Sequence, residues 1–356
     1  MSCLVDCKKT QTTFSDISVS EYLIECLRLI IFVPMNFPDA FKAGVLKRES
    51  MGGVLLYGPP GTGKTMVCRA MASQWGMRMI QIKPSDLLSA FVGQSERVAK
   101  SIFSLAHRIA PCIIFIDEIE SLLHRRGQGD DRSHQRSLLN EFFQGMEGLQ
   151  SSEKQGTSGV VVIGATNRPF DIDEALLRRF PARYMVGLPD VAEREKILGI
   201  HLRETKLHKE VDIKSIARQT KKYSGSDLKN LCVAAATSAV KGAAKDFQWE
   251  RLTRVAASGD SSEREEVKIT LDDTEITKED FKKAMSEVPA SATKGRHEEI
   301  YEWHRKHGNK GDSTQTEKGI QKFIGPLRAF ARISKIRGVR LSFALTSRFP
   351  RDHPRK

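Results

Sequence analysis

Long hydrophobic runs are missing from this sequence of 356 residues. The longest candidate, residues 23–33, is interrupted by Glu25 and Arg28, whereas about 18 consecutive apolar residues are needed to span a bilayer. The N-terminus carries an acid at Asp6 and lacks the cationic and then apolar pattern of a signal peptide. We therefore expect neither a transmembrane helix nor a secretory leader.

Cysteine is also scarce. The six cysteines lie scattered along the chain, and no two of them form a C-x-x-C pair. This pattern argues against a disulfide scaffold and favours free thiols in a reducing, intracellular compartment. There is no internal repeat, the hydrophobic content of 40% suits a globular core, and the length allows about two domains.

Acidic residues are too few to balance the basic ones, so the formal net charge is +13. Residues 318–356 contain eleven Lys and Arg residues and one acid, which accounts for +10 of this excess and leaves only +3 on the rest. The sequence is that of an ordinary soluble body with a basic tail. The overall charge therefore gives no firm signal of nucleic-acid binding.

A glycine-rich stretch after an apolar run is the most informative part of the chain. Residues 58–65 read GPPGTGKT, which fits the phosphate-binding pattern G-x-x-x-x-G-K-[ST]. Glycines let backbone N–H groups turn toward phosphate oxygens, Lys64 reaches the outer phosphates, and the Thr65 hydroxyl takes a Mg²⁺ position. The following helix points its positive end at the anion. We therefore predict a site for ATP and Mg²⁺ whose loop residues are Gly58, Pro59, Pro60, Gly61, Thr62, Gly63, Lys64 and Thr65.

Strand-like and helix-like segments alternate after this loop. The pattern predicts strands at residues 78–82, 112–116 and 160–163, and helices at 66–75 and 98–109. This alternation is typical of an α/β fold with a doubly wound parallel sheet, in which ligands bind at the carboxyl ends of the strands.

Helices replace strands from about residue 189. The expected helices are residues 192–204, 213–220, 226–243 and 278–287, the third and fourth preceded by cap residues at Ser224 and Thr277. We expect a small all-helical lid domain here. The expected divisions are a disordered start at 1–13, a nucleotide-binding α/β domain at 14–188, the lid with a C-terminal helix at 189–305, and a basic, disordered tail at 306–356.

Asp117 and Glu118 directly follow the apolar strand at residues 112–116. Such a pair commonly completes a phosphate loop: the first carboxylate holds Mg²⁺ and the second polarises the attacking water. A pair of solvated acids at a strand end is the alternative, and it loses weight because a phosphate loop belongs to the same sheet.

Three further residues are candidates for hydrolysis. Asn167 follows the strand at 160–163, where its amide can hold the lytic water, although an ordinary turn residue fits the spacing equally well. Arg178 and Arg179 can stabilise charge on a transferring phosphoryl group, in cis or from a neighbouring subunit. The alternative for the two arginines is a solvated basic face.

Taken together, these motifs resemble an AAA ATPase module over residues 14–303. In this resemblance residues 58–65 are Walker A, residues 113–118 are Walker B, Asn167 is sensor 1, and Arg178 and Arg179 are the paired arginine fingers. It also implies that Asp16 and Ile17 lie against adenine and that Gly225 begins the lid segment that contacts nucleotide. The family assembles as hexamers with shared sites and threads protein substrates through a central pore.

The same resemblance assigns a first pore loop to residues 89–93, where Phe91 and Val92 would grip a peptide. A core phenylalanine in a loop is the alternative, and Ala90 lacks the basic charge that relatives commonly carry. The second pore loop would be residues 125–132.

Within the family the chain is most similar to the meiotic clade, and especially to the thorase-type protein translocases of the mitochondrial outer membrane. Those proteins have a transmembrane anchor ahead of the ATPase, and this chain shows no such segment. We expect location in the cytosol or on the cytosolic face of that membrane, and membrane association without a transmembrane segment. A microtubule-severing ATPase is the alternative within the clade. A nucleotide-gated scaffold or nucleic-acid binder using the basic tail is the alternative from another class.

Overall fold

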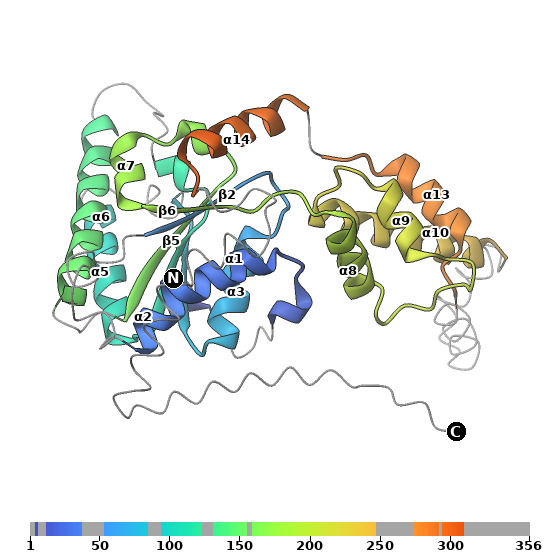
Figure 1. The fold of residues 1–356 in the computed structure, drawn as a ribbon, viewed down its shortest axis with the longest axis horizontal. Helices are drawn as coiled ribbons and strands as arrows, with labels where there is room; N and C mark the ends of the chain where they lie inside the picture. Colours follow the sequence, from blue (N-terminus) through green and yellow to red (C-terminus); the bar gives the residue numbers. More distant parts are fainter. Residues whose placement is uncertain are drawn as a thin grey trace, which may run out of the picture. The chain divides into compact units, whose positions relative to one another are not determined.

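The computed structural model describes residues 4–5, 12–37, 53–84, 94–122, 131–154, 159–246, 274–291 and 294–309. All of them belong to one unit that spans residues 1–309. Figure 1 shows the sheet of this unit with helices on both faces. The charged stretch at 254–274, for which we expect a loop insertion, lies outside these ranges apart from Thr274. Residues 310–356 of the basic tail expected at 306–356 also lie outside them.

The described strands form one six-stranded sheet in the order β1-β3-β4-β5-β2-β6. Their bounds are β1 Leu4–Val5, β2 Val54–Tyr57, β3 Arg78–Ile82, β4 Cys112–Ile116, β5 Val160–Thr166 and β6 Ala182–Met185. Five strands run parallel, and β1 pairs with β3 in the antiparallel direction. The predicted doubly wound α/β sheet is confirmed, with β1 as an antiparallel addition at one edge.

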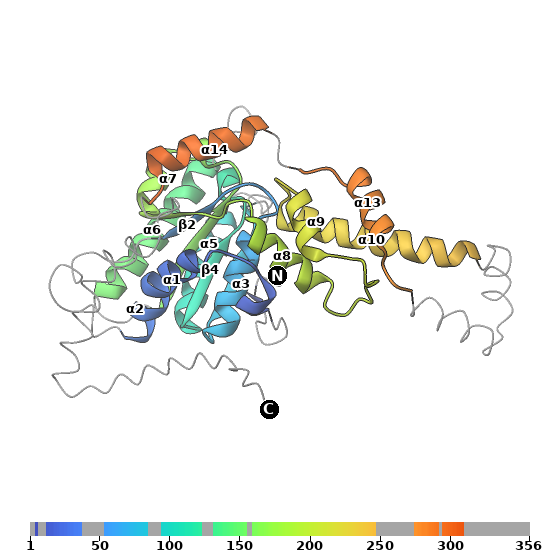
Figure 2. The same cartoon turned by 45° about the vertical axis from the view of Figure 1, so that its right-hand side comes forward.

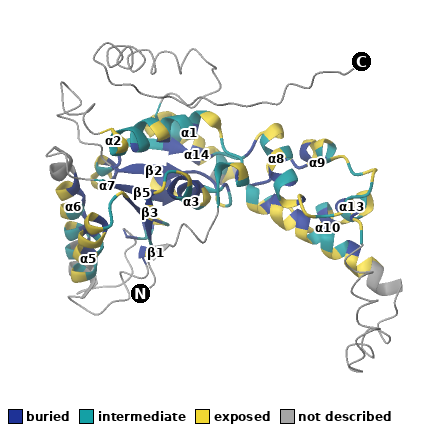
Figure 3. Ribbon diagram, turned by 90° about the horizontal axis from the view of Figure 1, so that it is seen from below, coloured by how far each residue is buried: buried dark blue, intermediate teal, exposed yellow. Residues whose placement is uncertain are grey.

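The sheet separates two hydrophobic cores because successive side chains of a strand point to opposite faces. In β2, Leu55 and Tyr57 join one core while Val54 and Leu56 join the other, and all four are fully buried. The first core is covered by α5 (Gln94–Arg108), α6 (Asp131–Lys154), α7 (Glu174–Arg179) and α14 (Lys294–His307). The second is covered by α1 (Glu21–Leu27), a π-helical turn (Arg28–Phe32), α2 (Val33–Asn36) and α3 (Lys64–Gln74). Figure 3 shows the buried strands between partly exposed helices.

Four helices form a third core of their own, as the sequence predicts: α8 (Val191–His201), α9 (Ile213–Gln219), α10 (Gly225–Asp246) and α13 (Lys278–Glu287) (Figure 2). Reciprocal capping boxes begin three of them, α8, α10 and α13. Ser224 and Asp227 exchange hydrogen bonds of 2.8 and 3.2 Å at α10, and the Thr277 side chain accepts from the backbone N–H of Asp280 at α13. Such caps contribute about 1 kcal/mol each.

Four elements depart from the sequence expectations. The C-terminal helix was expected to belong to the lid domain at 189–305, but α14 packs on the first core of the sheet through Ile300 and Trp303. Residues 1–13 were expected to be disordered, but Leu4 and Val5 pair with β3. β6 was not predicted because it is short and carries Arg183. α6 was not predicted either, although its buried residues Leu138, Phe142 and Met146 recur at the helical spacing of four.

Among the described residues, every helix is too short or too polar to cross a membrane.

Candidate nucleotide site

The phosphate loop connects the end of β2 to the start of α3. Gly58, Gly61 and Gly63 all have positive φ angles, of 151°, 73° and 96°. Residues with a Cβ rarely adopt such angles. The Lys64 ammonium donates hydrogen bonds to the Gly58 and Pro59 carbonyls at 2.9 and 2.7 Å. The loop is therefore folded around its own cation.

Lys64 is only 6% exposed. Burial lowers the pKa of its ammonium to about 8, and the nearby carboxylates of Asp117 and Glu120 oppose this shift. Desolvation penalises the charged form, so an anion that compensates the ammonium would be favoured here. A buried ammonium of this kind favours the binding of a phosphate group.

Asp117 and Glu118 lie at the carboxyl end of β4, next to the loop. The Thr65 hydroxyl donates to Asp117 Oδ2 at 3.0 Å, which joins the two motifs directly. A hydroxyl beside a carboxylate is an oxygen donor set of the kind that Mg²⁺ prefers. Glu118 has a φ of 52°, an uncommon conformation for a residue with a side chain that often marks functional sites.

Asn167 follows β5 beside the loop, since β5 pairs with β2 and the Gly58 N–H donates to the Thr166 carbonyl at 3.3 Å. The side-chain oxygen of Asn167 is buried and has no hydrogen-bond partner among the described residues. A buried acceptor without a partner is costly. It suits a role in holding water or phosphate, so the residues present fit a nucleotide with its Mg²⁺.

Glu120 is a buried acid that the sequence interpretation did not single out. Burial raises the pKa of its carboxyl, and a hydrogen bond from the Thr166 side chain opposes that shift. Its carboxylate also acts on the Lys64 ammonium. The sequence signal for Glu120 is that it is an acidic residue three positions after Asp117.

The lid helix α10 begins against the phosphate loop. The Ser226 N–H donates to the Gly61 carbonyl at 3.1 Å, and a Cβ added at Gly61 would lie 2.7 Å from Ser224 Oγ. Gly225, predicted to bind nucleotide, lies between these two serines. The predicted lid segment is therefore next to the loop.

Asp16 and Ile17, which are predicted to lie against adenine, belong to the entry segment before α1. The Asp16 carboxylate accepts hydrogen bonds from the backbone and hydroxyl of Thr13, at 2.8 and 2.7 Å, and the first of these is the main cause of its lowered pKa. Ile17 is buried in the core that contains α3. The structure thus uses Asp16 to cap a short 3₁₀ turn, Phe14–Asp16.

The two arginines occupy the opposite end of the sheet. The Arg179 carbonyl accepts from the Gly53 N–H at 2.8 Å, at the amino end of β2. Its guanidinium is 2.6 Å from a Glu147 carboxylate oxygen and 5.0 Å from the centre of the Phe143 ring, both on α6. Arg178 is 75% exposed, and Glu174, its ion-pair partner at 3.6 Å, is exposed as well.

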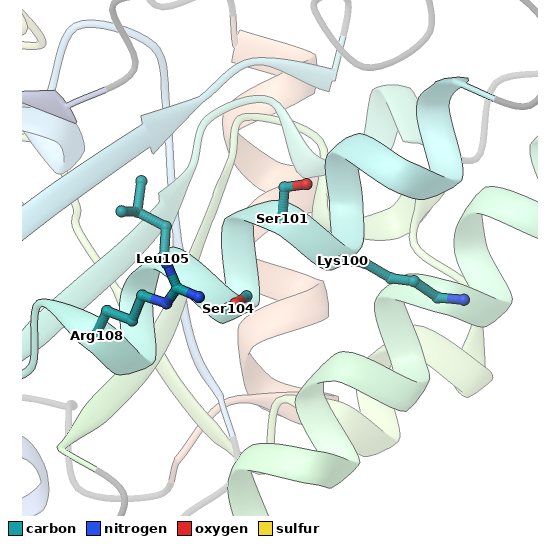
Figure 4. A pocket seen from close by; sticks show the side chains of 5 residues that line it. All are labelled: Lys100, Ser101, Ser104, Leu105 and Arg108. Atoms are coloured by element: carbon teal, nitrogen blue, oxygen red, sulfur yellow. The ribbon is translucent and has the colours of Figure 1, made fainter.

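The predicted pore residues Phe91 and Val92 lie outside the described residues, as do residues 123–130 of the expected second pore loop. The outer face of α5 carries a shallow hollow lined by Lys100, Ser101, Ser104, Leu105 and Arg108 (Figure 4). All five come from one helix, and none of them belongs to the motifs above.

The fold and the site define a P-loop nucleotide-binding protein with a helical lid. Two family models match: "ATPase family associated with various cellular activities (AAA)" over residues 54–188, and "AAA+ lid domain" over residues 210–250.

Curated relatives agree with the family models. An outer mitochondrial transmembrane helix translocase of Danio rerio is 38% identical over 251 residues, covering 70% of this chain and 65% of the relative. A second such translocase of Danio rerio is 34% identical over 295 residues, covering 83% and 75%. A katanin-like p60 ATPase of Homo sapiens is 34% identical over 292 residues, covering 82% and 56%. The chain thus spans less than two thirds of the first of these relatives.

Solved structures give the same result. The AAA domain of FIGL-1 in complex with ADP matches with a TM-score of 0.65 and 32% identity, covering 83% of this chain and 91% of that one. A structure titled "Structural Basis for Katanin Self-Assembly" matches with a TM-score of 0.66 and 28% identity, covering 85% and 93%. The chain belongs to the AAA ATPase family, which confirms the resemblance and the predicted class of enzyme.

Proposed function

We propose that this chain is an ATP-hydrolysing AAA motor that works as a hexameric ring and remodels protein substrates. The observation that carries the proposal is the division of catalytic groups between the two ends of β2. The phosphate loop, Asp117 and Asn167 lie at its carboxyl end, whereas Arg179 is tied to Gly53 at its amino end.

The residues at the carboxyl end take distinct roles in the proposed reaction. Lys64 and the loop N–H groups hold the phosphates, while Thr65 and Asp117 hold Mg²⁺. The metal, when bound, supplies charge neutralisation at the phosphate oxygens. Glu118 accepts the proton of the attacking water, and the buried amide oxygen of Asn167, which has no partner within the described part of the chain, orients that water.

Arg178 and Arg179 cannot complete the site of their own chain. Gly58 lies five positions after Gly53, which in a strand spans roughly 16 Å at ~3.3 Å per residue. The exposed guanidinium of Arg178 is therefore available to a neighbouring protomer. One solved neighbour concerns the self-assembly of katanin, which supports a ring for this chain.

For the substrate we propose proteins with misplaced transmembrane helices at the cytosolic face of the mitochondrial outer membrane, gripped by Phe91 and Val92 in the pore. The 38% identity to an outer mitochondrial transmembrane helix translocase supports this choice. Microtubule severing is the second candidate, supported by the 34% identity to a katanin-like ATPase.

The first test measures how the ATPase rate per protomer depends on protein concentration, for the wild type and for Glu118→Gln. We expect a rate that rises with concentration and vanishes in the variant, because sites shared between protomers require assembly. Nucleotide binding without turnover in the wild type would reject the motor and favour the scaffold alternative, which also predicts salt-dependent affinity for nucleic acid.

The second test separates the two substrates. The protein is tethered to vesicles that hold a protein with a single transmembrane helix, and ATP-dependent release of that protein is measured. Stabilised microtubules are assayed in parallel by light microscopy. Release without severing supports the translocase, and severing without release supports the katanin-like activity.

A further inference from the structure

The C-terminal helix α14 contacts three segments that lie next to the phosphate loop, Asn167 and the two arginines. Its Trp303 and His304 contact Tyr57, the residue before the phosphate loop. It packs on the 3₁₀ turn Pro169–Asp171, which begins two residues after Asn167. Its end is bonded to Arg183, four residues after Arg179, through the His307 carbonyl and the Asn309 N–H at 3.3 and 3.2 Å.

The contact with Tyr57 is the most specific of the three. Tyr57 is fully buried, although it ends in a polar hydroxyl. That hydroxyl lies 2.5 Å from His304 Nδ1. The Trp303 ring meets the Tyr57 ring edge-on with centroids 4.6 Å apart, an arrangement that favours one orientation of the phenol.

The neighbourhood of His304 is suited to this hydrogen bond. Burial lowers the pKa of its imidazole, which favours the neutral ring, and a neutral imidazole can accept the phenolic hydrogen bond at Nδ1. Gly308 provides the space, because a Cβ there would lie 2.3 Å from His304 Nδ1 and 2.4 Å from the Tyr57 hydroxyl.

We propose that His304 is a positioning residue of the nucleotide site, which fixes the phosphate loop through Tyr57. The Tyr57 backbone continues directly into Gly58, so holding the phenol limits the motion of the chain that enters the loop. A loop that is already ordered loses less entropy on binding phosphate. This inference rests on the proposed function only for its consequence in nucleotide affinity.

Backbone hydrogen exchange without nucleotide tests the positioning itself. His304→Leu removes the hydrogen bond, whereas His304→Asn retains a polar atom near the place of Nδ1. Lys306→Ala is the matched control, because Lys306 is exposed on the same helix. We expect exchange in residues 58–64 to be roughly fivefold faster in the leucine variant, the loss of about one net hydrogen bond. The asparagine and control variants should remain within about twofold of the wild type.

ADP affinity, followed by calorimetry, tests the consequence. We expect roughly fivefold weaker binding for His304→Leu and for Tyr57→Phe, and no further loss when the two are combined, since each removes the same interaction. Tyr57→Phe also serves if the leucine variant does not fold. Equal exchange in all variants, or an asparagine variant that behaves like leucine, would overturn the inference.

The two proposals fail in different ways. Wild-type protein that binds no ADP, together with faster loop exchange in His304→Leu, would reject the ATPase and leave the positioning role intact. Normal ADP binding in the wild type, together with equal loop exchange in all variants, would reject the positioning role and leave the ATPase intact.

Discussion

The two ends of β2 differ in how far this chain completes them by itself. At the carboxyl end, Lys64 is buried and bonded into the loop, and Thr65 is bonded to Asp117. At the amino end, Arg178 extends into solvent and Arg179 is held by Glu147 of its own chain. The nucleotide-binding half is preformed, and the arginine half is not.

This difference bears on how activity is controlled. A preformed binding half allows a single chain to take up nucleotide, because its polar groups are already oriented. In the proposed ring, the arginine half gains a target only when another chain brings its own phosphate loop. Binding and hydrolysis are therefore expected to respond differently to protein concentration.

The largest expected effect on the ATPase rate comes from substitutions that disable the nucleotide-binding half and the arginine half separately. Glu118→Gln and Arg178→Ala should each reduce the ATPase rate by about two to three orders of magnitude. A mixture of the two inactive proteins should regain activity, because some interfaces then pair an intact Glu118 with an intact Arg178. The rate of the mixture is measured against each variant alone.

Lys64→Ala mixed with Glu118→Gln is the control, since both changes damage the nucleotide-binding half. Every chain in that mixture carries a defective binding half, so no interface holds a complete site and no activity should return. An inactive mixture of Glu118→Gln and Arg178→Ala would mean that Arg178 does not act between protomers.

A smaller effect is expected from pH. With the pKa of Lys64 lowered to about 8, nucleotide affinity should fall as pH rises above 8, by about tenfold at pH 9 if only the ammonium binds phosphate. ADP titrations between pH 7 and 9 measure this. Lys64→Met should bind weakly at every pH, and an equal slope in that variant would assign the effect to another group.

The lowered pKa of Lys64 also affects the stability of the fold, and there a rise in pH is favourable rather than unfavourable. The folded-state pKa lies below the ordinary value of 10.5, so between these values the unfolded chain binds more protons. The contribution of Lys64 to the free energy of unfolding therefore rises with pH in this window. Urea unfolding without nucleotide at pH 8 and 10 should show a rise that is absent in Lys64→Met.

The smallest expected effect distinguishes the two arginines by stability. Arg179→Ala loses a partly exposed ion pair and a ring contact, together about 1 kcal/mol, and should lower the melting temperature by about 2–4 °C. Arg178→Ala should leave it unchanged, because both members of its ion pair are exposed. Differential scanning calorimetry of the two variants measures the comparison, and equal melting temperatures would contradict it.

Much of the fold was predictable from local patterns. The buried strand Cys112–Ile116 is a continuous apolar run, and Lys278–Glu287 carries its own cap, so both were predicted with their observed bounds. β6 was not predicted because its residues form a strand only through pairing with β2. Arg183 follows the two candidate arginines in a basic stretch of the sequence, whereas in β6 its guanidinium donates to the Leu177 and Phe180 carbonyls.

The candidate site divides in the same way. Motif spacing predicted Lys64, Thr65 and Asp117, because neighbouring strand ends bring them together. Spacing carries no information about long-range partners such as Glu147 for Arg179 or His304 for Tyr57, which lie 32 and 247 residues apart in the sequence. Those contacts depend on how separate helices pack.

The alternation of side chains along β2 limits how this region can evolve. Substitutions between residues 54 and 57 alter one core at a time. The insertion or deletion of a single residue would instead exchange the two sets of side chains between the cores and rotate the start of the phosphate loop. Among homologous chains, gaps in an alignment should therefore avoid the stretch from Gly53 to Thr65, even where individual residues differ.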